Sequence, residues 1–278
     1  MQNLDPKTMP TPTYLLQISA KNGQAEVVRY LFDTLPECRL RKPWSPAIPE
    51  GINSWNDIPR KWRIGEDFVI FNAIEGTDPI AIFKVFFDYG MSPNYNLERM
   101  ISPLALAIPN RLELAKFLLE KGANPNGHYT LVEETFLCAA ARAQKPDMIN
   151  LFIKHGARIQ GSNALQDAAA YRRICNAERL LELGANIDEV FKKTEYAPIS
   201  EPNVYSRDIV LGSALHCAVK GGTLNFPVTD SPADMVRFLL ERGARTDIVD
   251  GNGKTALQVA RRAGMRDVIK VFEEYAKK

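Results

Sequence analysis

The sequence lacks a strong charge of either sign. Its 35 basic and 33 acidic residues, out of 278, give a formal net charge of +2, so there is no global field to collect nucleic acid or an anionic membrane surface. It also lacks an apolar run of the about 20 residues that a transmembrane helix needs. Because the chain is still 45% hydrophobic and 24% charged, we expect a folded globular protein with no membrane span.

Cysteine and histidine are scarce and scattered. The four cysteines include no C-x-x-C pair, and His128, His155 and His216 occupy non-equivalent places. No cluster has the spacing of metal ligands, and no motif of a serine hydrolase, a metalloprotease, a P-loop or a dinucleotide fold is present. We therefore predict no metal, no cofactor and no catalytic residue, and we prefer a non-enzymatic role.

Nothing at the start of the sequence has the pattern of a secretory signal. The residues MQNLDPKTMPTPTY are polar and rich in proline, without a basic flank and an apolar run. The cysteines lie mostly within helical patterns, as expected of buried thiols in a reducing compartment. We therefore expect a cytoplasmic or nuclear protein.

Tryptophan is absent from all but one stretch. Trp44, Trp55 and Trp62 lie in RKPWSPAIPEGINSWNDIPRKW, whose prolines exclude a continuous helix. Tryptophan and arginine dominate binding hot spots, so we predict an inserted loop whose tryptophans contact a partner or ligand. Packing of the loop against the rest of the protein is the competing interpretation. Stacking on nucleic-acid bases is disfavoured by the near-neutral total charge.

The sequence does contain a repeated pattern. It is marked by the strings FDYGMSPN, LEKGANPN, IKHGARI, LELGANID and LERGARTD. Each ends an amphipathic helical pattern with a glycine, which suits the left-handed residue that follows a helix. Apolar residues before each glycine recur at spacings of three and four, which predicts one buried helical face. Shorter helical patterns rich in small residues come before, such as SALHCAV and TALQVAR.

These units resemble the ankyrin repeat, which opens T-P-L-H-x-A-A and ends G-A-D-x-N before a β-turn. The closest local match is GARTDIVDGNGKTALQVARRAG, from Gly243 to Gly264. The resemblance implies an all-α fold, an ankyrin-repeat solenoid of stacked helix-turn-helix units with β-turn or hairpin fingers and inserted loops. The units stack because neither helix of a pair can bury its apolar face alone.

We expect a single ankyrin-repeat domain over residues 1–278. Its repeats begin near positions 14, 68, 102, 135, 163, 213 and 255, and their irregular spacing predicts insertions at about residues 36–67, 189–212 and 221–232. Insertions in repeat proteins form loops, often on the binding face. The second insertion should lengthen one finger. The string SPAD in the third predicts a helix capped by Ser231, with Pro232 at its first position.

At the histidine position of the motif, His216 is the one histidine present. The resemblance implies a structural role for it, a hydrogen bond to the neighbouring turn. The other repeats have different residues there, namely Gln17, Phe71, Ala105, Cys138, Gln166 and Gln258. We therefore expect a thin hydrogen-bond network between the repeats.

The resemblance also implies a concave groove, built from first helices and fingers, that grips a partner protein. The groove positions of the family, carried onto this chain, give a polar cluster near the centre that contains Arg142, Asp167, Tyr171, Arg172 and Arg173. We predict the first four as contacts to a partner or ligand, above all Arg142 and Tyr171. Ordinary solvent-exposed residues at helix ends are the competing interpretation.

Two functions remain open. The preferred one is a protein-protein interaction scaffold that binds a partner protein or peptide through the concave groove and the inserted loops. The alternative is a small-molecule-binding or catalytic pocket, formed where the aromatic insertions cover the groove, because ligand sites are concave and mostly apolar with few polar groups. A pocket requires the insertions to converge, whereas a scaffold leaves an open groove with an apolar rim.

Overall fold

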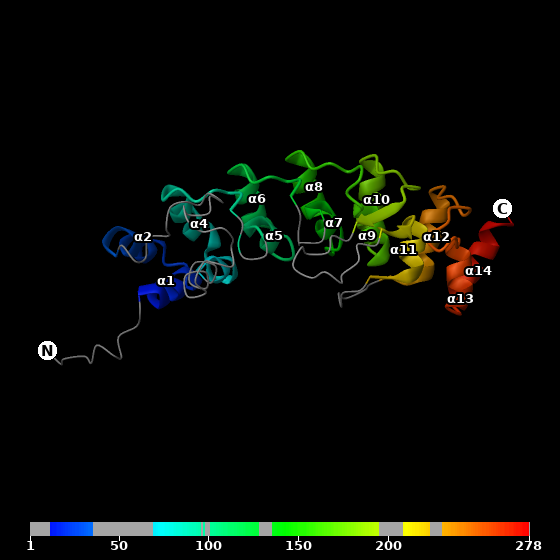
Figure 1. Cartoon of the computed structure of the whole chain (residues 1–278), viewed down its shortest axis with the longest axis horizontal. Coiled ribbons are helices and arrows are strands. Elements are labelled where there is room, and N and C mark those ends of the chain that lie inside the picture. Colours follow the sequence, from blue (N-terminus) through cyan, green and yellow to red (C-terminus); the bar gives the residue numbers. More distant parts are fainter. Residues whose placement is uncertain are drawn as a thin grey trace. The chain divides into compact units, whose positions relative to one another are not determined.

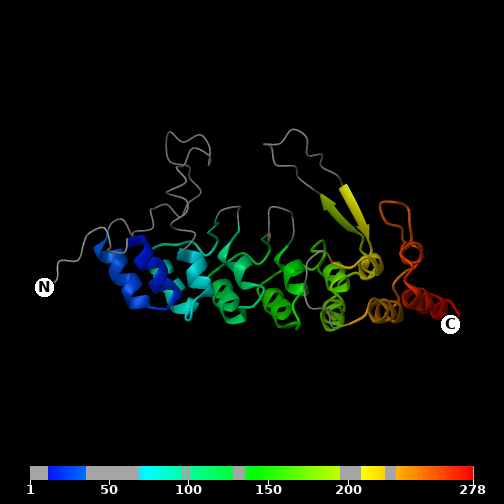
Figure 2. The same ribbon diagram turned by 90° about the horizontal axis from the view of Figure 1, so that it is seen from below.

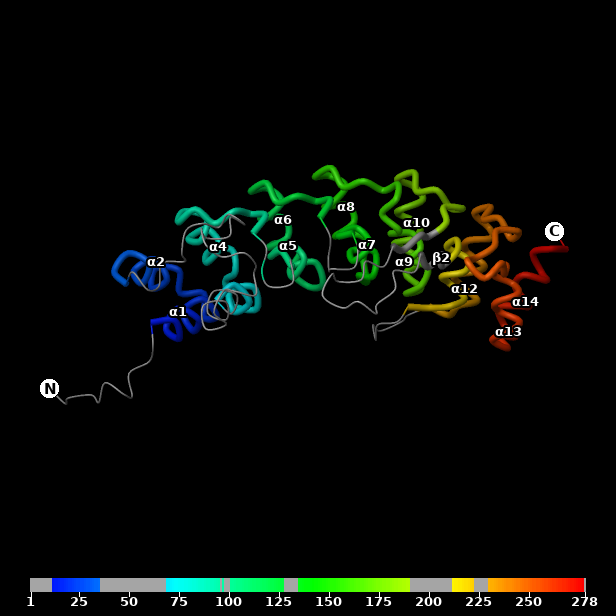
Figure 3. Tube along the Cα trace, in the orientation of Figure 1, coloured from blue at the N-terminus to red at the C-terminus, as the bar shows by residue number. Residues whose placement is uncertain are grey.

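The computed structural model describes residues 12–35, 69–95, 97, 101–127, 135–194, 208–222 and 230–277. These residues form helix pairs joined by short turns (Figures 1 and 3). The predicted fold, an ankyrin-repeat solenoid built from helix-turn-helix units, is confirmed. The helices fall into two compact units, Met1–Asn124 and Pro125–Lys278, and each unit is described by itself.

The first unit is built around stacked second helices. Its pairs are α1 (Pro12–Lys21) with α2 (Ala25–Thr34), a helix at residues 69–75 with α4 (Pro79–Asp88), and α5 (Pro103–Ala107) with α6 (Leu112–Glu120). Helix α4 packs between α2 and α6. Phenylalanines fill these contacts: the ring centroids of Phe32 in α2 and Phe86 in α4 lie 6.1 Å apart, and Phe87 of α4 stacks on Phe117 of α6 at 5.8 Å.

The described residues of the second unit form four helix pairs. They are α7 (Phe136–Ala141) with α8 (Asp147–Lys154), α9 (Ala164–Ala170) with α10 (Ile174–Glu182), α11 (Ala214–Lys220) with α12 (Pro232–Glu241), and α13 (Ala256–Arg262) with α14 (Arg266–Tyr275). The first helices α7, α9, α11 and α13 pack on one another in that order. Alanines such as Ala168 and Ala218 are fully buried there, and their small side chains let neighbouring repeats approach closely.

Short polar residues set where several of these helices begin. Thr135 Oγ1 accepts a hydrogen bond from the backbone N–H of Cys138 at 3.1 Å. Ser231 forms a capping box with Asp234, with Pro232 in the first turn. Side-chain oxygens at these places satisfy N–H groups that have no partner inside the helix. The helix start predicted from SPAD is therefore confirmed.

A β-hairpin supplements the helices of the second unit. Strands β1 (Phe191–Thr194) and β2 (Asp208–Gly212) pair antiparallel. Strand β2 contacts α11, and the two strands stand out from the stacked helices of this unit (Figure 2). The hairpin falls within the predicted second insertion, at the place where we expected a longer finger.

The other predicted insertions are described in part or not at all. The stretch 36–67, with Trp44, Trp55 and Trp62, lies outside the described residues. The insertion at 221–232 is described only at its two ends, residues 221–222 and 230–232. The predicted role of the tryptophans therefore stays a prediction.

Side chains at the finger bases tie each repeat to the next. Asn126 Nδ2 donates to the carbonyl of Gly156 at 3.0 Å, while Asn126 Oδ1 accepts from the N–H of Arg158 at 2.8 Å. Asn94 makes the same pair of hydrogen bonds within the first unit. Gln160 continues the series with one longer contact, 3.5 Å, to the carbonyl of Gly184. We call this series the finger ladder.

Replacing Asn126 with alanine should weaken the second unit. The Asn126→Ala variant loses two hydrogen bonds at once, so we expect the free energy of unfolding to fall by about 1–2 kcal/mol. Urea unfolding followed by circular dichroism measures the change. The matched variant Gln160→Ala loses one long contact and should stay within about 0.5 kcal/mol of the natural protein. Equal effects of the two substitutions would contradict a special role for the asparagine.

Candidate functional site

The histidine position of the motif makes inter-repeat hydrogen bonds in three consecutive repeats of the second unit. In each, the side chain donates to a backbone carbonyl of the next repeat: Cys138 to Asn163 at 3.8 Å, Gln166 to Glu189 at 2.8 Å and His216 to Lys254 at 2.9 Å. The structural role expected of His216 is confirmed. The expected thin network is wrong for these repeats, because cysteine and glutamine also carry a donor that reaches the carbonyl.

The hydrogen bonds of His216 fix its protonation. Nδ1 accepts from the backbone N–H of Ser213 at 3.1 Å, so the proton lies on Nε2 and is donated to Lys254. Burial lowers the pKa of His216 below its ordinary value. The hydrogen bond to Lys254 opposes this shift, and the charge of Lys220 adds to it. Folding therefore favours the neutral imidazole.

Lys220 itself forms an ion pair that crosses to the next finger. Its Nζ lies 2.7 Å from Asp250 Oδ2, and the Asp250 side chain is only 2% exposed. Burial raises the pKa of Asp250, but hydrogen bonds from Lys220 and from the backbone of Lys254 and Asn252 outweigh burial and lower the pKa to about 2. Asp250 is therefore ionised at neutral pH and serves the turn and the repeat contact.

The predicted polar cluster exists, and its centre is buried. Arg142 Nε lies 2.5 Å from Asp167 Oδ2, with 7% and 13% of the two side chains exposed. The guanidinium carbon of Arg142 also lies 5.2 Å from the centre of the Tyr171 ring, within the range of a cation–π contact. The structure thus brings these three predicted residues together at the junction of α7 and α9.

Exposure separates the members of this cluster. As whole residues, Arg142 is 6% and Tyr171 is 4% exposed, so the contacts observed for both are internal. The groove positions transferred from the family led us to expect both at the surface. Arg172, in the turn after α9, is only half-buried. A binding role for Arg142, Asp167, Tyr171 and Arg172 stays a prediction. Arg172 is more accessible than Arg142 or Tyr171.

Close approach of the next repeat buries Tyr171. The backbone N–H of Gly222, just after α11, donates to the carbonyl of Ala170 at 3.0 Å. A Cβ atom at Gly222 would fall 2.5 Å from Cε1 and 2.7 Å from Cε2 of Tyr171. Such distances are closer than van der Waals contact, so this position requires glycine.

Two cysteines of this region, Cys138 and Cys217, offer no reactive thiolate. Cys138 and Cys217 are buried, and burial, aided by the charge of Asp167, raises the pKa of both thiols, that of Cys217 to about 12. Thiols with a raised pKa stay protonated and are poor nucleophiles and metal ligands. Within the described ranges, no group of three or more His, Cys, Asp or Glu residues could hold a metal ion.

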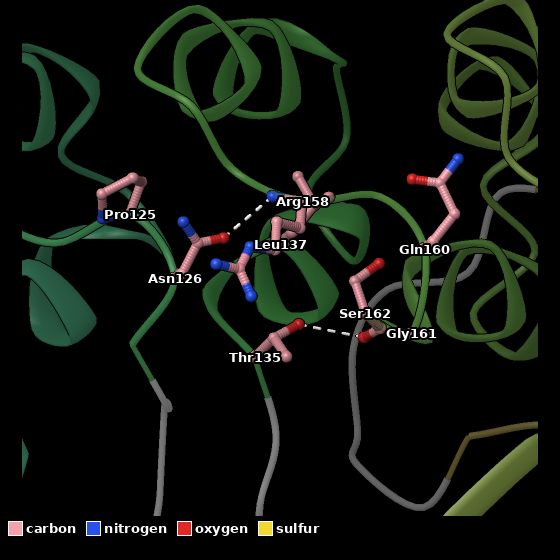
Figure 4. Close-up of a pocket in the computed structure, with 8 residues that line it drawn as sticks. All are labelled: Pro125, Asn126, Thr135, Leu137, Arg158, Gln160, Gly161 and Ser162. Carbon is pink, nitrogen blue, oxygen red and sulfur yellow. Dashed lines mark hydrogen bonds between the residues drawn. The ribbon is translucent and has the colours of Figure 1, made fainter.

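A depression open to solvent lies between two fingers of the second unit (Figure 4). It is lined by Pro125, Asn126, Thr135, Leu137, Arg158, Gln160, Gly161 and Ser162. The buried Leu137 and the half-buried Pro125 give it an apolar part, and the exposed side chains of Arg158 and Gln160 give it polar groups. Sequence reasoning missed this depression, because folding brings its lining together from the turns at residues 125–126 and 158–162 and from the start of α7.

Comparisons with known proteins agree with this geometry. A family model described as ankyrin repeats, three copies, matches residues 104–190. The solved ankyrin repeat protein EF0377 is similar over 74% of this chain and 96% of its own, with 25% identity and a TM-score of 0.55. The ankyrin repeat domain of Bcl-3, a member of the IkappaB family, is similar over 71% and 79%, with 19% identity and a TM-score of 0.51. The curated protein sequences give no match.

Residues 104–190 therefore consist of ankyrin repeats, and the helix-turn-helix fold of the chain is that of ankyrin repeat proteins. Repeats of this family generally mediate protein–protein interactions. No helix in the described part of the chain combines the length and apolar character that crossing a membrane requires.

Adding one methyl group at Gly222 should loosen the junction of the second unit. The new Cβ of Gly222→Ala overlaps the Tyr171 ring, so we expect the free energy of unfolding to fall by about 1–3 kcal/mol. Urea unfolding measures this loss. In a Tyr171→Ala background the overlap is gone, and the same substitution should cost much less. Equal costs in the two backgrounds would show that Tyr171 does not set the need for glycine.

The stability of the second unit should depend on pH through His216. Because its pKa is lowered in the folded state, the unfolded chain binds the proton more readily, and stability is lost as pH falls below 6.5. His216→Gln, which mimics Gln166, should keep the hydrogen bond and reduce the loss between about pH 7 and pH 5. Urea midpoints at the two pH values test this. His155→Gln is the control, and an unchanged loss in His216→Gln would refute the assignment.

Proposed function

We propose that this protein is a protein-protein interaction scaffold that binds a partner protein or peptide through the first-helix ends and fingers of its second unit. The observation that carries the proposal is the open depression between the fingers. The exposed arginine and amide groups at its edge match the polar rim of a protein interface, in which arginine is enriched. We also propose that both units belong to one repeat domain.

The finger ladder supports this proposal. Asn126 binds the backbone of Gly156 and of Arg158, where the chain enters the finger that carries the Arg158 side chain. A finger held in place before binding loses less conformational entropy when a partner arrives. The exposed Arg158 and Gln160 side chains are therefore presented on a rigid support.

The proposal leaves the inserted segments as contributors to specificity. The hairpin of β1 and β2 extends one finger of the same unit, and Trp44, Trp55 and Trp62 remain predicted contacts outside the described residues. No observation on the described residues favours the alternative of a small-molecule or catalytic pocket covered by the insertions, so we do not propose it. The cytoplasmic or nuclear location is likewise our proposal.

Position-specific photocrosslinking tests which surface binds. A crosslinking amino acid is placed at Gln160 in the finger depression or, as the matched control, at Lys154, an exposed residue that ends α8. Each variant is irradiated in a lysate of the organism that carries the gene. We expect a discrete protein adduct from position 160 and none from position 154. Adducts at 154 alone, or at neither position, would contradict the proposed surface.

A further inference from the structure

The turn between α9 and α10 has the same backbone conformation as two turns of this chain that contain glycine, those at Gly23 and Gly264. The turn residue is left-handed in each case, with φ of 67° at Gly23, 69° at Gly264 and 55° at Arg172. In each turn the backbone N–H of the next residue donates to the carbonyl five positions earlier. These hydrogen bonds run from Gln24 to Ser19, from Met265 to Ala260 and from Arg173 to Ala168. An arginine therefore occupies a position where equivalent turns of the chain use glycine.

This backbone conformation is unfavourable for arginine. A left-handed φ brings Cβ close to the following carbonyl oxygen, a contact that glycine avoids because it has no Cβ. Residues held in such conformations persist where the surrounding structure fixes them, and they concentrate at binding and catalytic sites. Arg172 thus carries a cost in stability that a glycine would remove.

The side chain of Arg172 has a polar atom without a partner. Its Nε is buried and makes no hydrogen bond within the described part of the chain. The residue as a whole is half-buried, and Nη2 lies close to Gly221, where a Cβ atom would be 3.5 Å away. Polar atoms that are buried in native proteins nearly always have a hydrogen-bond partner. Arg172 is therefore partly accessible as a residue, and its Nε is unsatisfied.

The surroundings of Arg172 carry an excess of positive charge. Asp167 pairs with Arg142, and the Lys220 ammonium is matched by Asp250. Arg173 is 3% exposed, and its Nε donates to the carbonyl of Arg142 at 3.0 Å. Among the described residues, no carboxylate forms an ion pair with Arg172 or Arg173. Two arginine charges at this junction are therefore not neutralised by an acidic side chain.

We propose that Arg172 is the anchor of an anion site that takes an aspartate or glutamate side chain from an acidic peptide segment of the partner. The planar guanidinium offers donors in a fork that matches a carboxylate. The excess charge favours an acidic segment over a neutral one, and Nη2 of Arg172 lies beside Gly221, which has no side chain to cover it. This inference rests on the proposed function, because it names the chemistry of the partner that the second unit binds.

Selection from a displayed library of random peptides tests this inference on the full chain. We expect the natural protein to enrich peptides with neighbouring aspartates and glutamates. Arg172→Gly should lose that enrichment and bind a synthetic copy of the selected peptide at least about tenfold more weakly. Its melting temperature should stay equal or rise, because glycine accepts the turn without strain. Arg172→Lys should bind with intermediate affinity, and Arg237→Ala, on the exposed side of α12, should bind normally.

The outcomes separate this inference from the proposed function. Enrichment without acidic residues, or equal affinity of Arg172→Gly and the natural protein, would overturn the anion site alone. A fall in melting temperature together with lost binding would make Arg172 a structural residue and also overturn it. A phosphoserine copy that binds more than about tenfold tighter than the carboxylate peptide would reassign the site to phosphate. Failure to enrich any peptide would count against both proposals.

Discussion

The packing of one helix pair on the next is the interaction on which the rest of this structure depends. A single pair leaves the apolar side of both helices uncovered, so it is stable only between neighbours. In the second unit the contact is made through buried alanines such as Ala168 and Ala218, and their size sets how closely repeats approach. That spacing brings the side chain of Asn126 within reach of the next finger. The finger ladder is thus a consequence of core packing.

The buried ion pair of Arg142 and Asp167 matters more for how it places neighbouring residues than for the free energy of folding that it contributes. An ion pair inside a protein gains little over an apolar contact of the same shape, because both charges lose their hydration. Arg142 and Asp167 nevertheless join two repeats, and Arg142 covers one face of the Tyr171 ring. Gly222 approaches the same ring from the next repeat. These two contacts fix Tyr171 and with it the direction of the chain at Arg172, the residue that follows.

The fold was predictable because apolar periodicity and the glycines after helices report directly on local structure and packing. Ser231 is an example, since its capping role depends only on nearby residues. The burial of Tyr171 depends on Gly222, about fifty positions away, and no local pattern reveals such a contact. Cys138 and Gln166 were expected to weaken the network because they depart from the motif, whereas bonding needs only a donor. Alignment of Arg172 with Gly23 and Gly264 could have revealed the left-handed turn.

Amide hydrogen exchange on the free protein tests most directly the central claim, that the binding surface of the second unit is rigid before a partner arrives. The finger ladder and the Gly222 contact bury or bond the N–H groups of Arg158 and Gly222. The account predicts that these amides exchange far more slowly than those of unbonded turns, with protection close to that of the neighbouring helices. Exchange at the rate of an unstructured peptide would show that the fingers become ordered only on binding and would contradict the account.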